Sequence, residues 1–242
     1  MDKNQFSGGS YNNWERPIEQ STVSLNEGFV AKYITKVYGW MFLGLALTAV
    51  VAFLVASNEA FLISILKFRM LLFIGQLLMV GYLAVRINKM SSATATAIFL
   101  GYAALNGLTF AVLLLMFPPV TLMAIFGITA GTFGIMTAVG YFTKQDLTSF
   151  GRIMMMGLVG IIIASVVNMF MGSESLYWII SYVGVAVFVG LIAYDTQKIK
   201  AYAYLDSEEA RKKGAIMGAL ALYLDFINLF IFLLRLFGGR RN

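Results

Sequence analysis

Cysteine and histidine are both missing from this chain of 242 residues. Without cysteine the chain has no disulfides and no thiol nucleophile. Without histidine it has no Ser-His-Asp triad and no histidine ligand for haem or zinc. Histidine is also the only side chain that titrates near neutral pH without help from its surroundings. Any response to pH near neutrality must therefore come from carboxyl groups in unusual environments.

Charged residues are scarce as well, at 12% of the chain against about a quarter in an ordinary soluble domain. Hydrophobic residues make up 60%, and the mean hydropathy is +0.80. A soluble protein cannot hide that much apolar surface, so the composition predicts an integral membrane protein. The net charge is +6, and the basic residues lie between long apolar runs. This distribution favours loops that face anionic lipid over a surface that binds nucleic acid.

A polar N-terminal arm precedes a series of long apolar runs. We assign the arm to residues 1–32, which are rich in Asn, Ser and Gly, and expect it to be loosely ordered. About 20 apolar residues cross a bilayer as a helix, and the Pro118-Pro119 pair divides the longest run in two. Continuous rather than alternating hydrophobicity excludes a closed barrel and predicts one all-α transmembrane domain over residues 33–242. Its seven expected helices are 37–56, 70–85, 94–116, 120–142, 153–171, 176–194 and 215–234.

The positive charges predict the orientation of these helices. Loops on the side of the N-terminus hold nine Lys and Arg residues and the opposite loops hold two, which predicts a cytoplasmic N-terminus. Seven spans would then put the C-terminus outside, against which Arg240 and Arg241 argue weakly. A short or re-entrant seventh helix would resolve that conflict. The nine residues are Arg86, Lys89, Lys144, Arg152, Lys198, Lys200, Arg211, Lys212 and Lys213, and the two are Lys67 and Arg69.

Two of the 12 acidic residues belong to the expected spans rather than to the arm or the loops. Asp195 follows the cytoplasmic end of the sixth span, and Asp225 lies about 15 Å into the seventh. Intramembrane carboxylates are unfavourable and normally face a bundle interior or a water-filled cavity. Asp195 reaches a similar depth only if its helix continues through Lys200. Two carboxyl groups brought together would share one proton, which predicts a proton switch in a protein without histidine.

Arg86 ends the second span on the same side of the membrane as Asp195, so it is a candidate counter-ion. With the arginine displaced, the two carboxylates could bind a hard cation such as Ca²⁺ transiently, because such ions choose oxygen ligands. The simpler readings are an Asp-Arg pair that only holds helices together, and an arginine that anchors the loop beside Lys89. Arg235 is interpreted as an interfacial anchor.

Three segments of the chain resemble a known family. The segment ALALYLDFINLF at 219–230, followed by Leu233-Leu234-Arg235, strongly resembles the last helix of the transmembrane Bax inhibitor motif family, also called the Bax inhibitor-1 family. The segment GLIAYDTQKI at 190–199 resembles its sixth-helix motif, and NGLTF at 106–110 resembles a third-helix motif. The likeness runs from about residue 31 to the C-terminus, and the bacterial members are the most similar in type.

This resemblance implies seven transmembrane helices, with the C-terminal one central and wrapped by the other six. It implies a pH-sensitive calcium leak channel, and neither an enzyme nor a protein with a bound cofactor. Asp195 and Asp225 match the two aspartates of the family's hydrogen-bonded pH-sensing dyad, and Arg86 matches by position the arginine latch that keeps the dyad closed. The expected partners are Ca²⁺, protons, the lipid bilayer and a membrane protein such as a protease, with no nucleic acid. The expected location is the bacterial cell (inner) membrane.

Two other functions compete with a proton-gated leak of Ca²⁺. Intramembrane aspartyl proteases also place two aspartates on adjacent helices, and the Tyr194-Asp195 pair fits them. The second aspartate of those enzymes sits in Gly-x-Gly-Asp, whereas Asp225 here follows the bulky Leu222-Tyr223-Leu224. The third possibility is a regulatory membrane protein that binds and modulates another membrane protein, with the dyad purely structural.

Overall fold

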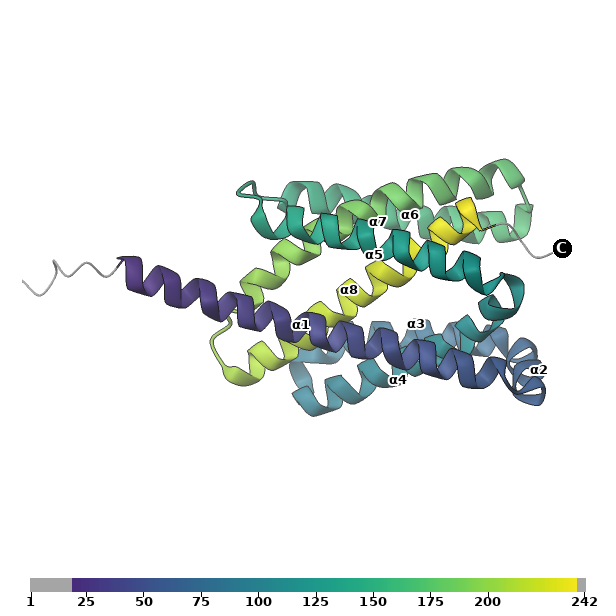
Figure 1. Cartoon of the computed structure of the whole chain (residues 1–242), viewed down its shortest axis with the longest axis horizontal. Helices are drawn as coiled ribbons and strands as arrows, with labels where there is room; N and C mark the ends of the chain where they lie inside the picture. Colours follow the sequence, from purple (N-terminus) through teal and green to yellow (C-terminus); the bar gives the residue numbers. More distant parts are fainter. Residues whose placement is uncertain (1–18, 239–242) are drawn as a thin grey trace, which may run out of the picture.

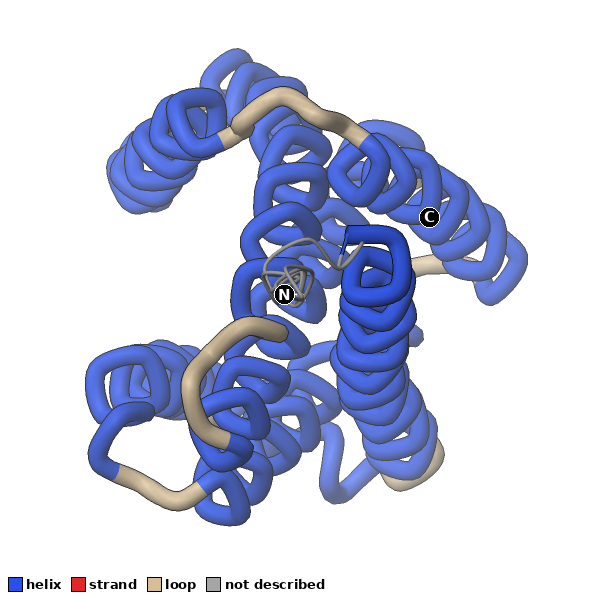
Figure 2. The backbone as a smooth tube through the Cα atoms, turned by 90° about the vertical axis from the view of Figure 1, so that its left-hand side faces the viewer, coloured by secondary structure: helices blue, strands red, loops and turns tan. Residues whose placement is uncertain are grey.

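The computed structural model describes residues 19–238, which are helical, with short loops and no strand among them (Figures 1 and 2). Seven of the helices are long and apolar enough to cross a membrane, which agrees in number with the expected spans. The elements in chain order are α1 (Glu19–Ala56), α2 (Glu59–Lys67), α3 (Arg69–Arg86), the 3₁₀ helix η1 (Ile87–Lys89), α4 (Ser92–Met116), α5 (Pro119–Phe142), α6 (Thr148–Met171), α7 (Glu174–Tyr202) and α8 (Glu208–Phe237).

The first helix begins much earlier than expected. Residues 19–32, which we placed in a loosely ordered arm, belong to α1, while residues 1–18 lie outside the described range. The extension is held by tertiary contacts, because Val30, Tyr33 and Ile34 are buried. The hydroxyl of Tyr33 also donates to the carbonyl of Arg211 at 3.0 Å. The polar composition of this segment did not predict a helix, because the contacts that stabilise it are tertiary.

The last two helices also exceed their expected lengths. Helix α7 continues through Lys200 to Tyr202, so the condition for bringing Asp195 into the bundle is met. Helix α8 has 30 residues, or about 45 Å, and runs from the end where α1 begins to the opposite end (Figure 1). The seventh span is therefore neither short nor re-entrant, which contradicts the expected way of reconciling Arg240 and Arg241 with an outside C-terminus. The two termini of the described chain lie at opposite ends of the bundle.

Helix α8 is the central element. Its apolar stretch is 72% buried inside the protein, whereas that of the peripheral α6 is only 6% buried. In Figure 1 it crosses diagonally between α5, α6 and α7 on one side and α3 and α4 on the other, with α1 lying across them. Its extensive contacts are with α1, α4, α5 and α7, while α3 packs chiefly on α4, and α6 on α7. Of the six helices expected to surround α8, four contact it extensively, and α3 and α6 form a second layer outside them.

Small residues let α5 and α6 approach the segment of α7 that carries Asp195. A methyl group added at Gly140 of α5 would collide with the backbone of Ala193, two residues before the aspartate. At Gly151 of α6 it would collide with the ring of Tyr194. Close backbone approach through small residues is the usual way that membrane helices pack. These two glycines therefore fix where the Asp195 segment of α7 lies.

A buried polar cluster holds the opposite face of α8 against α1 and α4. The hydroxyl of Tyr223 lies 2.7 Å from that of Thr48, which is also 2.8 Å from the carbonyl of Ala103. The rings of Phe99 and Tyr102 meet that of Tyr223 edge to face. Polar side chains that bond each other across helices stabilise a bundle where water is absent.

We expect Gly140→Ala to lower the free energy of unfolding by about 1–3 kcal/mol, because the new methyl meets a backbone that cannot move alone. The matched control is Gly131→Ala in the same helix, where the added methyl meets open space. The control should unfold like the wild type or slightly later. Thermal melting in detergent measures both, and equal melting of the two variants would contradict the packing described.

We expect Thr48→Val to lower the free energy of unfolding by about 1 kcal/mol, because the Tyr223 hydroxyl loses a buried partner. Thr48→Ser keeps the hydroxyl and should stay close to the wild type. A double-mutant cycle with Tyr223→Phe, followed by unfolding in detergent, isolates the pair. Strictly additive effects of Thr48→Val and Tyr223→Phe would show that the bond contributes nothing.

Candidate functional site: the carboxyl pair between α7 and α8

The two intramembrane aspartates project from neighbouring helices. Asp195 lies seven residues, about 10 Å, before the end of α7 and is partly buried. Asp225 lies inside α8, and only 4% of its surface is exposed. Because the two helices pack along their length, the aspartates meet at their contact. The structure therefore brings together the two carboxyl groups that the sequence singled out.

The two carboxyl groups lie close enough to act on each other across the contact between α7 and α8. Oδ2 of Asp225 is buried and accepts a bond from no donor among the described residues. A buried carboxylate oxygen without a donor is strongly unfavourable, and a proton held between the two groups removes that penalty. The arrangement thus fits a pair that shares one proton, which is the chemistry expected of a proton switch.

A cluster of hydroxyl groups lies next to Asp195. The hydroxyl of Tyr38 in α1 donates to that of Thr137 in α5 at 3.1 Å and lies 3.3 Å from that of Thr196 in α7. The ring of Tyr38 packs edge-on against Phe133, which in turn packs on Phe226, the neighbour of Asp225. Sequence reasoning missed this cluster. In the sequence these residues appear only as hydroxyl-bearing side chains inside apolar runs. Such side chains are too common in membrane helices to indicate a site.

The cations near this site differ from the expected one. Lys198, one turn beyond Asp195 on α7, is the basic residue whose charge acts on that aspartate. Arg86 ends α3, is exposed, and makes no hydrogen bond or ion pair with either aspartate in the described part of the chain. This structure therefore does not place the expected latch on the dyad, and the role of Arg86 stays a prediction.

Another acidic residue, Asp146, lies in the α5–α6 loop outside the spans. The hydroxyl of Thr148 donates to it at 2.6 Å and the backbone N–H of Thr148 at 2.9 Å. These bonds hold the pKa of Asp146 below its ordinary value, because they favour the ionised form. Asp146 is therefore charged throughout the neutral range and is no candidate for a pH sensor.

The dyad has the donor atoms for Ca²⁺ but not the number that a resident ion needs. Within residues 19–238, no three acidic side chains gather as a metal site. Calcium ordinarily takes six to eight oxygen ligands, so two carboxylates can only contact an ion that keeps most of its water. This suits the passage of an ion better than its storage.

An apolar layer lies between the dyad and the far end of α8. Seven residues after Asp225, Phe232 stacks on Phe188 of α7 with ring centroids 5.8 Å apart. The same ring fills the space beside Gly184, where a methyl group would collide with it. Phe230 stacks on Phe110 of α4 in the same layer of the bundle. The carboxyl pair is therefore covered by aromatic rings on that side.

Comparison with known proteins places this site in a family. The family model described as inhibitor of apoptosis-promoting Bax1 matches residues 30–242. The inner membrane protein YbhL of Escherichia coli (strain K12) is 45% identical over 231 residues, which cover 93% of this chain and 98% of that protein. A protein of Borreliella burgdorferi is 44% identical over 87% of this chain and 93% of its own length. A protein of Deinococcus radiodurans is 43% identical over 87% and 92%.

The matched region contains all seven membrane-spanning helices and both aspartates of the dyad. The identity to each of these three proteins exceeds 40% over at least 87% of this chain, so the similarity extends far beyond the three motifs. The chain therefore belongs to the Bax inhibitor-1 family.

Proposed function

We propose that the protein is a pH-sensitive calcium leak channel whose gate is the Asp195–Asp225 pair. The observation that carries the proposal is the meeting of two carboxyl groups inside the bundle, one of them with a buried oxygen that has no donor. With a proton between them the pair is closed and singly charged. Without it, two negative charges either separate α7 from α8 or attract a cation, because like charges in a poorly polar interior repel strongly.

The surroundings leave the pair free to respond to protons. Lys198 and Asp225 act on Asp195, and Asp195 acts on Asp225. No arginine within residues 19–238 forms an ion pair with either aspartate. The aromatic layer formed by Phe188 and Phe232 fits a closed pathway, which would open when α8 shifts against α7. Ca²⁺ is then the permeant ion and moves down its gradient.

Location and orientation follow from separate arguments. We infer that the protein is in the bacterial inner membrane, because the relative from E. coli is named an inner membrane protein. The N-terminus is assigned to the cytoplasm by the excess of Lys and Arg at the end where α1 begins. Asp195 then lies nearer to the cytoplasmic end, seven residues before the end of α7, and Asp225 lies near the middle of α8.

A proteolytic function fits the geometry less well. An aspartyl protease must bring both carboxyl groups against a peptide bond with a water between them. Asp225 is 4% exposed and packed among bulky side chains, and the glycines of the protease motif are absent before it. Regulation of another membrane protein, such as a protease, is the alternative that remains if no ion flux is found.

Calcium flux into proteoliposomes between pH 5 and 9 tests the proposal. We expect Asp225→Asn to change the leak rate and to flatten its pH dependence, because the amide cannot exchange the shared proton. Asp195→Asn should act in the same direction. The matched control is Asp206→Asn, an exposed aspartate in the α7–α8 loop, which should leave the profile unchanged. Wild-type flux equal to that of empty liposomes would reject the leak, and the regulatory alternative would take its place.

The latch is tested separately. If Arg86 reaches the dyad in another state of the channel, Arg86→Gln should raise the leak at the pH where the wild type is closed, because the closed state loses a counter-ion. Lys89→Gln, three residues further along the same loop, is the control for a general loss of positive charge. Equal effects of the two changes on flux would identify Arg86 as a surface anchor only.

A further inference from the structure

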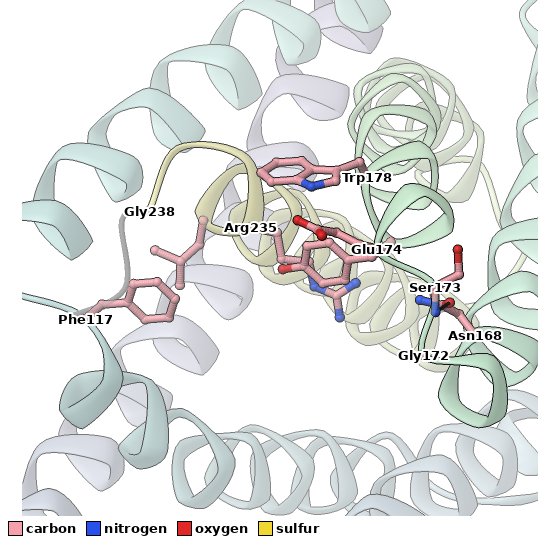
Figure 3. A pocket seen from close by; sticks show the side chains of 10 residues that line it. Phe117, Asn168, Gly172, Ser173, Glu174, Trp178, Arg235 and Gly238 are labelled. Atoms are coloured by element: carbon pink, nitrogen blue, oxygen red, sulfur yellow. Dashed lines mark hydrogen bonds between the residues drawn. The ribbon is translucent and has the colours of Figure 1, made fainter. Parts of the chain in front are cut away.

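A cavity of about 530 Å³ opens at the end of the bundle opposite to the start of α1 (Figure 3). It lies where the α4–α5 turn, the α6–α7 turn and the end of α8 come together (Figure 1). Asp225 lies ten residues, about 15 Å, before Arg235 on α8, and neither aspartate lines this cavity, so the cavity is a separate feature. The residues that line the cavity include Phe117, Asn168, Glu174, Tyr177, Trp178 and Arg235.

Arg235 supplies a cation without a partner in the described part of the chain. Its guanidinium carbon lies 5.5 Å from the ring centre of Tyr177 and 5.3 Å from that of Phe232. It is half-buried and neither donates a hydrogen bond to any described residue nor pairs with one of their carboxylates. A guanidinium has five donors in a planar fork that matches a phosphate. Two aromatic contacts hold this fork in place and leave its donors available.

Glu174 supplies an acid on the same wall. It is the first residue of α7 and lines the cavity together with Arg235. The two opposite charges do not pair with each other, since the one ion pair within residues 19–238 joins Lys212 to Glu208. In Figure 3 the carboxylate of Glu174 lies beside Trp178, with no bond drawn to Arg235. The cavity thus presents separated positive and negative groups with aromatic surface between them, a pattern that fits a zwitterion.

The position of the cavity indicates where that zwitterion comes from. Tyr177, Trp178 and the exposed Tyr182 form an aromatic group in the first turns of α7, which is typical of side chains at the headgroup level of a membrane. A second cavity of about 170 Å³ shares Asn168, Tyr177 and Arg235 and also touches Met169 and Ile180, between α6 and α7. Ser165 completes its lining, and the apolar side chains of Met169 and Ile180 suit the first carbons of an acyl chain.

We propose that this cavity binds the phosphoethanolamine headgroup of a phospholipid. The phosphate accepts bonds from Arg235, and the ammonium group lies against Glu174 and the ring of Trp178. The acyl chains leave between α6 and α7. This site does not depend on the proposed calcium leak, because it uses none of the residues of the dyad.

Native mass spectrometry of the delipidated full-length protein, titrated with phosphatidylethanolamine and phosphatidylglycerol, tests the site. We expect the wild type to prefer phosphatidylethanolamine. Arg235→Gln should weaken the binding of both lipids by about tenfold or more, since charged hydrogen bonds to the phosphate are lost. Glu174→Gln should remove only the preference for phosphatidylethanolamine. Unchanged binding of phosphatidylethanolamine by Arg235→Gln would overturn the proposal.

Three controls keep the result interpretable. Lys67→Gln removes a cation at the same end of the bundle but outside the cavity, and should bind like the wild type. Arg235→Lys keeps the charge without the fork and should retain part of the binding, which separates a lost contact from a misfolded protein. Thermal melting of each variant in detergent checks its fold.

Further arms distinguish the source of the group. Binding of glycerophosphoethanolamine as tight as that of the lipid would support the headgroup chemistry but assign it to a soluble compound. Tight binding of inorganic phosphate alone, with no preference between the lipids, would overturn a zwitterion site. A gain of tenfold or more in lipid binding after removal of residues 239–242 would overturn it too, because the tail of the chain would then be the occupant.

Discussion

A carboxyl group buried in a membrane-spanning bundle needs a partner, and here each of two aspartates is the partner of the other. Asp225 lies on the most buried helix of the protein and has an oxygen that no described donor reaches. Asp195 comes from α7, the helix in most extensive contact with α8. Since neither carboxylate is satisfied alone in a poorly polar interior, the proposed gate ties the relative position of α7 and α8 to the protonation of the pair.

The packing around α8 treats its two faces differently. On one face, Tyr223 bonds to Thr48 and packs against the aromatic rings of α4, so its polar groups are satisfied. On the other face, Asp225 meets a helix that glycines in α5 and α6 hold close. A satisfied polar face anchors a helix, whereas a face with an unsatisfied oxygen can respond to a proton or a cation. This asymmetry links the architecture to the proposed gate.

The two ends of the bundle have different chemistry. The end where α1 begins is rich in Lys and Arg and carries the approach to the dyad, with Lys198 as the nearest acting cation. The opposite end has a cavity with aromatic side chains, Arg235 and Glu174, and the two charged groups have no ion-pair partner among the described residues. Aromatic rings on Phe188 and Phe232 lie between these two regions. The proposed gate and the proposed lipid site are therefore separate along one helix.

The sequence alone determined the seven spans and their order, because apolar runs of bilayer length leave helices as the main solution for the backbone. It also singled out Asp195 and Asp225, since acids inside such runs are rare. Only the tertiary structure decided that residues 19–32 are helical, that four helices touch α8 directly, and that Arg86 pairs with neither aspartate within the described part of the chain. Those features rest on contacts between segments more than a hundred residues apart, such as Tyr33 with Arg211. The pattern of hydrophobicity along the chain does not determine which helix faces pack against each other.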